Sequence, residues 1–227
     1  MTCGTLYIVA TPIGNLGDIS LRALEVLKSV DCIAAEDTRM TRKLLSHYKL
    51  STPLVSYHDH VEHTKAQNLV EQLQEGKDIA LVSDSGMPLI CDPGYNLVQK
   101  ALAAQIELVC IPGPSALVNA LVLSGLAVDR FVFEGYLSRK PSKRRKEIRL
   151  LIDEKRTIIF YESPHRLLKA LHDVLAILGN RRIAVMRELT KKFEEQFHGS
   201  VEEAIAHFTK TGVRGEFVVV LSGQHTD

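Results

Sequence analysis

The sequence predicts an α/β protein made of two α/β domains, residues 1–114 and residues 115–227. Through the first half, short apolar runs without polar alternation take turns with helical patterns, as in a mostly parallel sheet covered by helices. In the second half some strands come in neighbouring pairs, which indicates a mixed sheet. A chain of 227 residues is long enough for two small domains.

The first domain is predicted from five apolar runs and three helical patterns. Runs this short and apolar favour strands that are buried on both faces. The predicted strands are residues 6–10, 32–35, 53–57, 79–82 and 108–111. The predicted helices are residues 18–30, 64–75 and 95–104. Asp18 and Ser20 are candidate caps of the first helix, whereas Val98, Ala101 and Leu102 are expected to face inward on the third.

The second domain begins with a helix of small and apolar residues, 115–123, which we interpret as a hinge. The predicted strands are residues 130–133, 157–161, 182–186, 193–197 and 216–221. The third and fourth of these strands are close enough in sequence to form a hairpin. Ser163 and Pro164 are expected to open a helix whose core face is leucine, and Gly179 is expected to end it.

Charge is balanced over the whole chain but not locally. With 28 Lys+Arg against 27 Asp+Glu, the net charge favours no class of partner. Residues 138–149 (SRKPSKRRKEIR) are mostly basic, too lopsided for the i,i+4 pairing of an ordinary solvated helix face. We interpret this segment and its basic companions as a phosphate-contacting surface. The predicted contacts are Arg39, Arg42, Lys43, Arg139, Lys140, Lys143, Arg144, Arg145 and Arg166. The chain has no Trp, so stacking on many bases is not expected.

The cysteines and the hydropathy pattern indicate the compartment. Cys3, Cys32, Cys91 and Cys110 form no CxxC motif, and we expect buried free thiols in a reducing cytosol. The sequence shows no secretory leader and no apolar stretch near the roughly 20 residues that a spanning helix needs. We therefore expect a soluble, cytoplasmic protein.

Polar loops directly follow four of the predicted strands in the first domain. In open α/β sheets the loops at the carboxyl ends of the strands line the ligand crevice. Residues 83–94 (SDSGMPLICDPG) form the most specific of these loops, since an ordinary turn into a helix needs only about two to six residues. Residues 112–116 (PGPSA) suit either a ligand loop or a domain-linking turn. The sequence contains neither a dinucleotide fingerprint nor a P-loop.

Carboxylates and histidines near these strand ends are candidate proton acceptors. Glu36 and Asp37 stand beside Arg39, where a surface ion pair with a helix cap is the alternative reading. His58, His60 and His63 match no standard zinc spacing, so we expect no metal. A loop histidine beside a cleft can instead contact substrate or transfer a proton.

Six motifs, in order over essentially the whole chain, resemble a known family. They are residues 9–18 (VATPIGNLGD), 35–39 (AEDTR), 83–94 (SDSGMPLICDPG), 111–116 (IPGPSA), 160–166 (FYESPHR) and 215–217 (GEF). Together they are similar to the bacterial 16S ribosomal RNA cytidine 2′-O-methyltransferases of the tetrapyrrole methylase superfamily. The resemblance implies two α/β domains of the tetrapyrrole methylase type, with S-adenosyl-L-methionine held in the cleft between them, and a homodimer.

The same resemblance implies which residues bind the cofactor. In the loop after the fourth predicted strand, Met87 stands where members of the RNA branch more often carry Thr, so backbone contacts are expected there. The implied cofactor contacts are Pro12, Gly86, Met87, Pro88, Ile90, Gly113, Ser115, Ala116 and Tyr161, with Glu216 nearby.

The implied reaction is methyl transfer to the ribose 2′-hydroxyl of a decoding-centre cytidine in 16S ribosomal RNA, within the small ribosomal subunit. Candidate proton acceptors are Asp84, Glu36, Asp37 and His58, of which Asp84 is the first choice because it lies in the most specific loop. Two alternatives stay open: a precorrin-type tetrapyrrole methylase on the same fold, and a non-catalytic RNA-binding protein of ribosome assembly. Cofactor binding and RNA methyl acceptance separate them.

Overall fold

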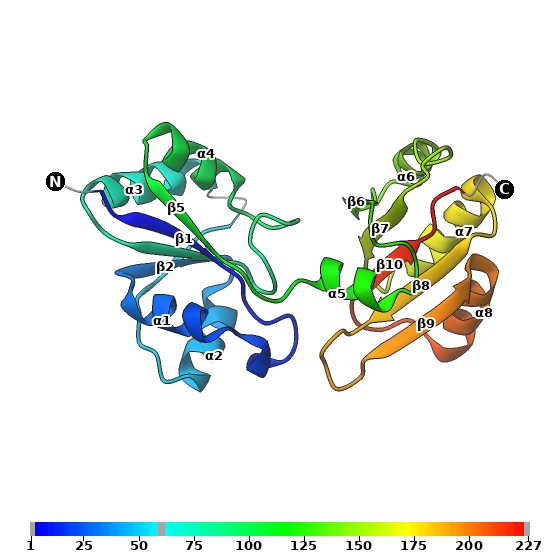
Figure 1. Ribbon diagram of the computed structural model, residues 1–227, viewed down its shortest axis with the longest axis horizontal. Coiled ribbons are helices and arrows are strands. Elements are labelled where there is room, and N and C mark those ends of the chain that lie inside the picture. The colour runs from blue at the N-terminus through cyan, green and yellow to red at the C-terminus, as the bar shows by residue number, and fades with distance from the viewer. Residues whose placement is uncertain (1–2, 59–61, 225–227) are drawn as a thin grey trace. The chain divides into compact units, whose positions relative to one another are not determined.

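The computed structural model describes residues 3–58 and 62–224, apart from the side chains of residues 62–64 (Figure 1). The chain folds into two compact units, Met1–Ser115 and Ala116–Asp227. Each unit contains one five-stranded sheet with its own hydrophobic core. The two-sheet α/β architecture that the sequence predicts is confirmed.

The sheet of the N-terminal unit is parallel throughout. Its strands are β1 (Thr5–Val9), β2 (Cys32–Ala35), β3 (Leu54–Ser56), β4 (Ile79–Val82) and β5 (Glu107–Ile111), in the order β3-β2-β4-β1-β5. Every residue of β2 and β4 is buried, as their uniform apolar character predicts. The expectation of burial on both faces is wrong for β5, because β5 lies at the edge of the sheet and exposes Glu107 and Cys110.

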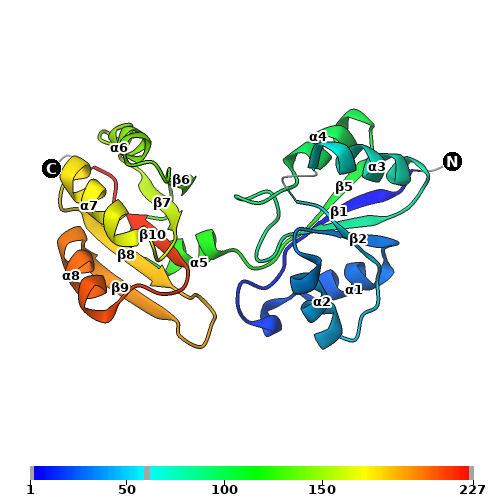
Figure 2. The same ribbon diagram turned by 180° about the vertical axis from the view of Figure 1, so that it is seen from behind.

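Helices cover both faces of this sheet. Helices α1 (Leu21–Ser29) and α2 (Thr38–His47) lie on one face, and α3 (Glu62–Gln74) and α4 (Tyr95–Ala103) lie on the other (Figures 1 and 2). A one-turn 3-10 helix, η1 (Leu16–Asp18), precedes α1.

The helix boundaries and buried faces differ in detail from the predictions. Ser20 caps α1, since its hydroxyl accepts the amide hydrogen bond of Ala23, and Asp18 instead ends η1. On α4 the prediction that Leu102 faces inward is wrong. Leu97 and Ala101 are buried, and Leu102 is exposed.

The sheet of the C-terminal unit is mixed. Its strands are β6 (Phe131–Tyr136), β7 (Thr157–Glu162), β8 (Arg182–Arg187), β9 (Glu195–Ser200) and β10 (Phe217–Leu221), in the order β6-β7-β10-β8-β9. Only β6 and β7 pair in parallel; the other neighbours are antiparallel, and β8 with β9 forms the predicted hairpin.

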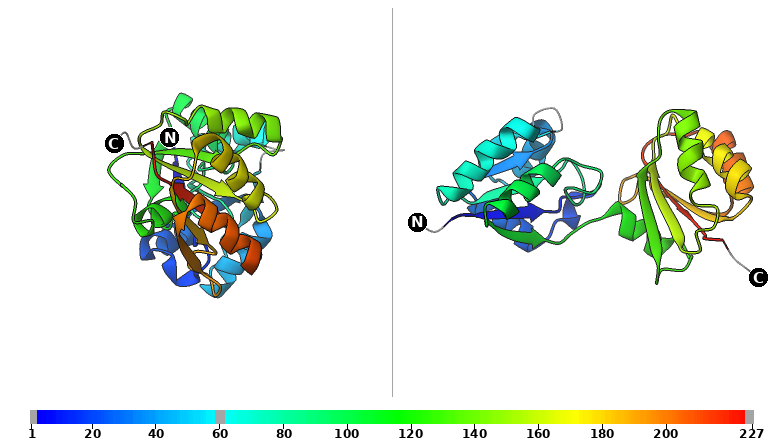
Figure 3. Two further views of the ribbon diagram at one scale, coloured as in Figure 1. Left: turned by 90° about the vertical axis from the view of Figure 1, so that its right-hand side faces the viewer. Right: turned by 90° about the horizontal axis from the view of Figure 1, so that it is seen from above.

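Four helices pack on this second sheet. Helices α6 (Pro141–Arg149), α7 (Leu167–Leu178) and α8 (Val201–Thr211) bury their apolar residues in one core, and α5 (Ala116–Leu123) lies against the opposite face (Figure 3). Gly179 ends α7 with a φ of +83°, as predicted. The predicted start of α7 is wrong: Ser163 and Pro164 lie in a preceding turn, where the Ser163 hydroxyl accepts a hydrogen bond from the Arg166 side chain.

All four cysteines carry free thiols, but only Cys32 is buried. The expectation that the thiols are buried is therefore wrong for Cys3, Cys91 and Cys110. Cys110 is exposed because its strand lies at the sheet edge. Within the described residues, no helix has both the length and the apolar character needed to cross a membrane.

Candidate functional site

Loops that follow β1, β2, β4 and β5 meet at the carboxyl edge of the N-terminal sheet, because all its strands run in parallel. The loops after β1 and β4 are joined through their backbones. The Thr11 amide donates to the Gly86 carbonyl (2.8 Å), and the Gly86 amide donates to the Thr11 carbonyl (3.0 Å). Gly86 has a φ of +80°, a conformation that side chains with a Cβ adopt at a cost. The expected cofactor loop is thus positioned by main-chain atoms.

Asp84 links the ends of β2 and β4, which are neighbours in the sheet. Its Oδ1 accepts a hydrogen bond from the Asp37 amide (2.9 Å), and its own amide donates to Glu36 Oε2 (3.4 Å). Burial and the Asp37 charge raise the pKa of Asp84, against the Asp37 amide and Arg39, which lower it. The structure therefore brings together three of the four candidate proton acceptors.

Arg39 makes Asp37 and Asp84 differ in basicity, because it forms an ion pair with Asp37. Its guanidinium forms a two-pronged ion pair with Asp37, with Nη2 2.6 Å from Oδ2 and Nε 3.0 Å from Oδ1. These hydrogen bonds lower the pKa of Asp37 to about 2. Because a stronger acid is a weaker base, Asp37 is the poorer proton acceptor and Asp84 the better one.

The loop of residues 83–94 contains two non-glycine residues in the left-handed backbone region. Leu89 and Cys91 adopt φ values of +73° and +67°, which non-glycine residues rarely adopt. Gly94, at the end of the loop, packs against Leu81, and a Cβ there would lie 2.8 Å from the Leu81 Cδ2. Strain of this kind persists only where the surroundings hold it, and it clusters at ligand-binding sites.

The loop after β5 approaches β1 closely at Gly113. A Cβ at this position would lie 2.9 Å from the Ala10 Cβ, closer than real Cβ contacts. Pro12 follows β1, and Ser115 and Ala116 follow Gly113 along the chain. The glycine is therefore required for the close approach of two loops that both carry expected cofactor contacts.

The histidine segment is only partly described. His58 lies two residues past the end of β3, an edge strand paired with β2. His60 lies outside the described residues, and the His63 side chain is not described. Among the described side chains, no group of three or more His, Cys, Asp and Glu is placed to hold a metal ion.

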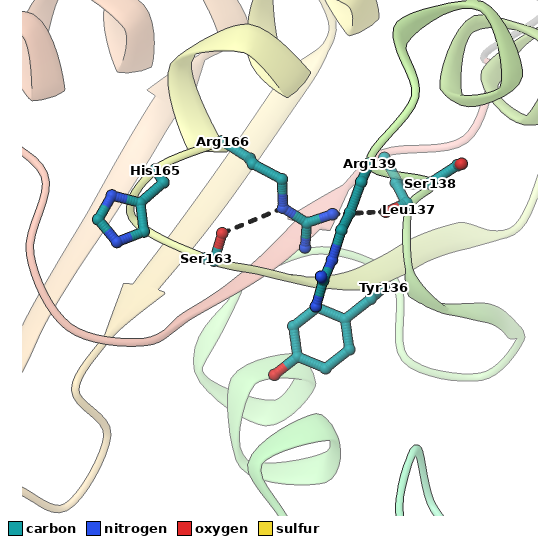
Figure 4. A pocket seen from close by; sticks show the side chains of 7 residues that line it. All are labelled: Tyr136, Leu137, Ser138, Arg139, Ser163, His165 and Arg166. Atoms are coloured by element: carbon teal, nitrogen blue, oxygen red, sulfur yellow. Dashed lines mark hydrogen bonds between the residues drawn. The ribbon is translucent and has the colours of Figure 1, made fainter.

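The C-terminal unit contains a pocket of about 660 Å³ between the loops after β6 and β7 (Figure 4). Its lining residues are Tyr136, Leu137, Ser138, Arg139, Ser163, His165 and Arg166. Arg166 reaches from the start of α7 across to the β6 side, where its Nη1 donates to the Leu137 carbonyl (2.9 Å). Its Nε donates to Ser163 Oγ (3.1 Å) and its Nη2 pairs with Glu162 (2.7 Å).

Glu162 holds the β7 side of this pocket in place through Arg166 and the Ser163 amide. The sequence analysis does not identify it as a site residue. Its side chain is fully buried, and its Oε1 accepts the Ser163 amide (2.8 Å) as well as Arg166. Its Oε2 is buried without a hydrogen-bond partner among the described residues. Burial raises the pKa of Glu162, while the Ser163 amide and the Arg166 and Arg144 charges oppose that shift.

The basic segment of residues 138–149 has two faces. Arg139, Lys140, Lys143 and Arg145 are exposed, as a phosphate-contacting surface requires. Arg144 is 3% exposed, and its guanidinium pairs with Asp173 on α7 (2.7 Å). The structure therefore places Arg144 in the core and not on the predicted surface. Arg39, Arg42 and Lys43 are exposed along α2, on the N-terminal unit.

Tyr161 and Glu216 lie in the C-terminal unit. The Tyr161 ring contacts the edges of the Phe133 and Tyr136 rings, with centroids 5.0 and 5.5 Å away. Glu216 pairs with Lys191 (2.8 Å), which also pairs with Glu188 (3.0 Å). The sequence does not predict this ion-pair cluster, because Glu216 lies just before β10, whereas Glu188 and Lys191 lie in the connection between β8 and β9.

Comparison with known proteins identifies the fold. A family model described as Tetrapyrrole (Corrin/Porphyrin) Methylases matches residues 5–205. The crystal structure of uroporphyrin-III-C-methyltransferase from Thermus thermophilus has the same fold, with a TM-score of 0.67 and 20% identity, over 96% of this chain and 94% of that one. The architecture is that of a tetrapyrrole methylase.

Closer relatives narrow the family. The chain is 54% identical to ribosomal RNA small subunit methyltransferase I of Synechocystis sp., over 97% of this chain and 79% of that protein. It is 50% identical to the protein of the same name from Halalkalibacterium halodurans, over 97% of this chain and 76% of that protein. The chain belongs to the tetrapyrrole methylase family and, within it, to the ribosomal RNA small subunit methyltransferases I.

Proposed function

We propose that this chain transfers the methyl group of S-adenosylmethionine to the ribose 2′-hydroxyl of a cytidine in 16S ribosomal RNA, with Asp84 as the proton acceptor. Its family membership makes it an S-adenosylmethionine-dependent ribosomal RNA methyltransferase. The observation that supports the finer assignment is the carboxylate cluster of Asp84, Glu36 and Asp37 at the edge where the glycine-containing loops meet.

The residues at this edge suit S-adenosylmethionine. Backbone groups of the loops after β1 and β4 are fixed by the Thr11–Gly86 bridge, and Ile90 exposes an apolar side chain in the same loop as Gly86. When bound, the cofactor supplies an electrophilic methyl group on a sulfonium ion. We propose that Pro12, the loop from Gly86 to Ile90, Gly113, Ser115, Ala116 and Tyr161 hold it.

The role of the chain in the reaction is to position the nucleophile and accept its proton. A ribose hydroxyl is scarcely ionised at neutral pH, so the proton must leave as the new bond forms. The raised pKa of Asp84 makes it a stronger base than Asp37 at the pH where it is still ionised. We propose that Glu36 and the Asp37 amide orient Asp84 and that His58 is the alternative acceptor.

Gly113→Val should weaken cofactor binding. Its Cβ alone would collide with Ala10, so the loop after β5 must move away from β1. Overpacking of this kind costs about 1–3 kcal/mol, so we expect the Kd for S-adenosylhomocysteine to rise by about 5- to 150-fold. Isothermal titration calorimetry on variant protein with unchanged circular dichroism measures this. An unchanged affinity would place the cofactor elsewhere.

The position of the methyl group is tested on the RNA itself. Enzyme is incubated with labelled S-adenosylmethionine and small ribosomal subunits, and the RNA is then digested with alkali. A 2′-O-methyl group blocks cleavage at its own linkage, so the label should appear in an alkali-resistant dinucleotide that begins with cytidine. Label released in an ordinary mononucleotide would mean methylation of a base and would contradict the assignment.

We also propose that the enzyme acts on the assembled small ribosomal subunit and that it acts as a homodimer. Both are supported by the family resemblance. Incubation with naked 16S RNA beside assembled subunits tests the first, and sedimentation equilibrium tests the second.

A further inference from the structure

We propose that the pocket between the β6 and β7 loops binds one nucleotide of single-stranded RNA, with its base against Tyr136 and its phosphate on Arg139. This inference rests on the proposed function, because it assumes an RNA substrate. It adds a second nucleotide site, built wholly within the C-terminal unit, to the reacting loops of the N-terminal unit.

Both walls of the pocket are fixed in place. On the β6 side, the Leu137 carbonyl accepts from Arg166 and the Ser138 amide donates to Glu147 (2.8 Å). On the β7 side, Glu162 holds the Ser163 amide and the Arg166 guanidinium. A volume of about 660 Å³ lies within the range of about 300–1,000 Å³ that small-ligand sites occupy. The pocket is preorganised, so little entropy is lost when a ligand enters.

The two arginines of the pocket have different roles. The Arg166 guanidinium is already bound to Ser163, Leu137 and Glu162, and its side chain is only 17% exposed. Arg166 therefore positions the pocket walls and does not bind the phosphate. Arg139 is exposed and makes no hydrogen bond or ion pair with any residue in the described ranges. A free guanidinium presents a planar fork of donors that matches two phosphate oxygens. Arg139 is therefore the phosphate ligand.

Tyr136 supplies the flat apolar surface that a base requires. Its residue is 53% exposed although its ring lies against Tyr161, and the Arg166 guanidinium carbon lies 6.0 Å from its ring centroid. An exposed aromatic ring beside a guanidinium is the arrangement on which single-stranded bases stack. A bare phosphate or polyphosphate would use Arg139 and leave the ring unused. The exposed ring thus favours a nucleotide over a simple anion.

Binding of a fluorescein-labelled, cytidine-containing oligoribonucleotide, followed by anisotropy at several salt concentrations, tests the pocket. We expect Tyr136→Ala to weaken binding by about 5- to 150-fold and Tyr136→Phe to preserve it. Arg139→Gln should weaken binding and reduce the log–log salt slope by about 0.7. Arg149→Gln, which removes the same charge from the far end of α6, should change neither measurement by as much. Tripolyphosphate, as a competitor, should bind equally to wild type and Tyr136→Ala.

Two results would overturn the pocket. One is Tyr136→Ala binding RNA as tightly as wild type, which would leave at most a site for bare anions. The other is Arg149→Gln losing as much affinity as Arg139→Gln, which would mean diffuse charge attraction. Methyl transfer to small ribosomal subunits separates this inference from the proposed function. If the wild type methylates the RNA and both pocket variants keep the wild-type KM, the nucleotide pocket is contradicted and the proposed function stands. If the wild type methylates no RNA while the variants still differ in RNA binding, the proposed function is contradicted and the pocket stands.

Discussion

Asp173→Ala should lower the free energy of unfolding of the C-terminal unit by about 3–5 kcal/mol, the usual cost of removing one partner from a buried ion pair. The side chains of Arg144 and Asp173 are 4% and 8% exposed, so the substitution leaves a guanidinium buried without its carboxylate. Urea denaturation followed by circular dichroism measures the loss.

Arg145→Ala is the matched control. Arg145 also pairs with Asp173 (2.7 Å), but its side chain is 56% exposed, and exposed pairs contribute at most about 1 kcal/mol. Equal losses in the two variants would show that burial of the Arg144–Asp173 pair is not the source of the effect.

The same pair gives a dependence on pH. Burial raises the pKa of Asp173, but hydrogen bonds from Arg145 and Arg144 outweigh it, so the pKa is lowered on folding. A carboxyl group with a lowered pKa stabilises the fold above its unfolded pKa of about 3.9, and this contribution is lost as the pH falls through the folded pKa. The stability difference between wild type and Asp173→Asn should therefore narrow below about pH 4.

Asp84→Asn should lower the kcat of methyl transfer by about 10²–10⁴-fold, the usual contribution of a general base. The asparagine Oδ1 can still accept the Asp37 amide, which Asp84 accepts at 2.9 Å, so the substitution removes the charge and keeps the loop contact. Because burial raises the pKa of Asp84, the wild-type kcat should rise with pH through that raised value, and the variant should lack this rise.

Asp31→Asn provides the comparison for Asp84→Asn. Asp31 accepts the Asp78 amide (2.8 Å) just before β2 begins, at the sheet edge away from the loops. The same chemical change there should leave kcat near the wild-type value. A variant Asp84→Asn with wild-type kcat would exclude Asp84 as the base and leave Glu36 and His58 as the acceptors to test.

The sequence predicted elements best where a single local pattern determined them. Uniformly apolar runs indicated the buried strands β2 and β4, and glycine indicated the end of α7. Strand order was not predictable, because it depends on how each crossover helix packs. Helix α8 was missed although Ser200 and Glu203 form a capping box, a signal that the sequence does contain. The sequence analysis also misses helix α2, although Asp37 caps it and Thr41, Leu44 and Leu45 are buried on one face.

The sequence shows the charge of a candidate site residue but not whether its side chain is exposed or buried. Arg144 was grouped with its exposed neighbours because a run of charges shows no periodicity. The buried face of α6 is defined by Arg144 and Ile148, and the carboxylate that compensates Arg144 lies in the next helix. Asp173 is the feature of the sequence that could have indicated a buried arginine, since a lone carboxylate among leucines requires a partner. The contact between Asp37 and Asp84 joins residues far apart in sequence and requires β2 and β4 to be neighbours.

The bridge between Thr11 and Gly86 determines which positions of this loop can change residue type over evolution. Its two hydrogen bonds use only main-chain atoms, which nearly all amino acids share. The backbone shape of this part of the loop therefore does not depend on the side chain at position 87, and an exchange between Met and Thr there leaves the bridge intact. The bridge constrains the residue type at Gly86 instead, because a φ of +80° disfavours other residues. Selection for loop shape should act on the glycine, while the neighbouring position remains available for tuning ligand contacts.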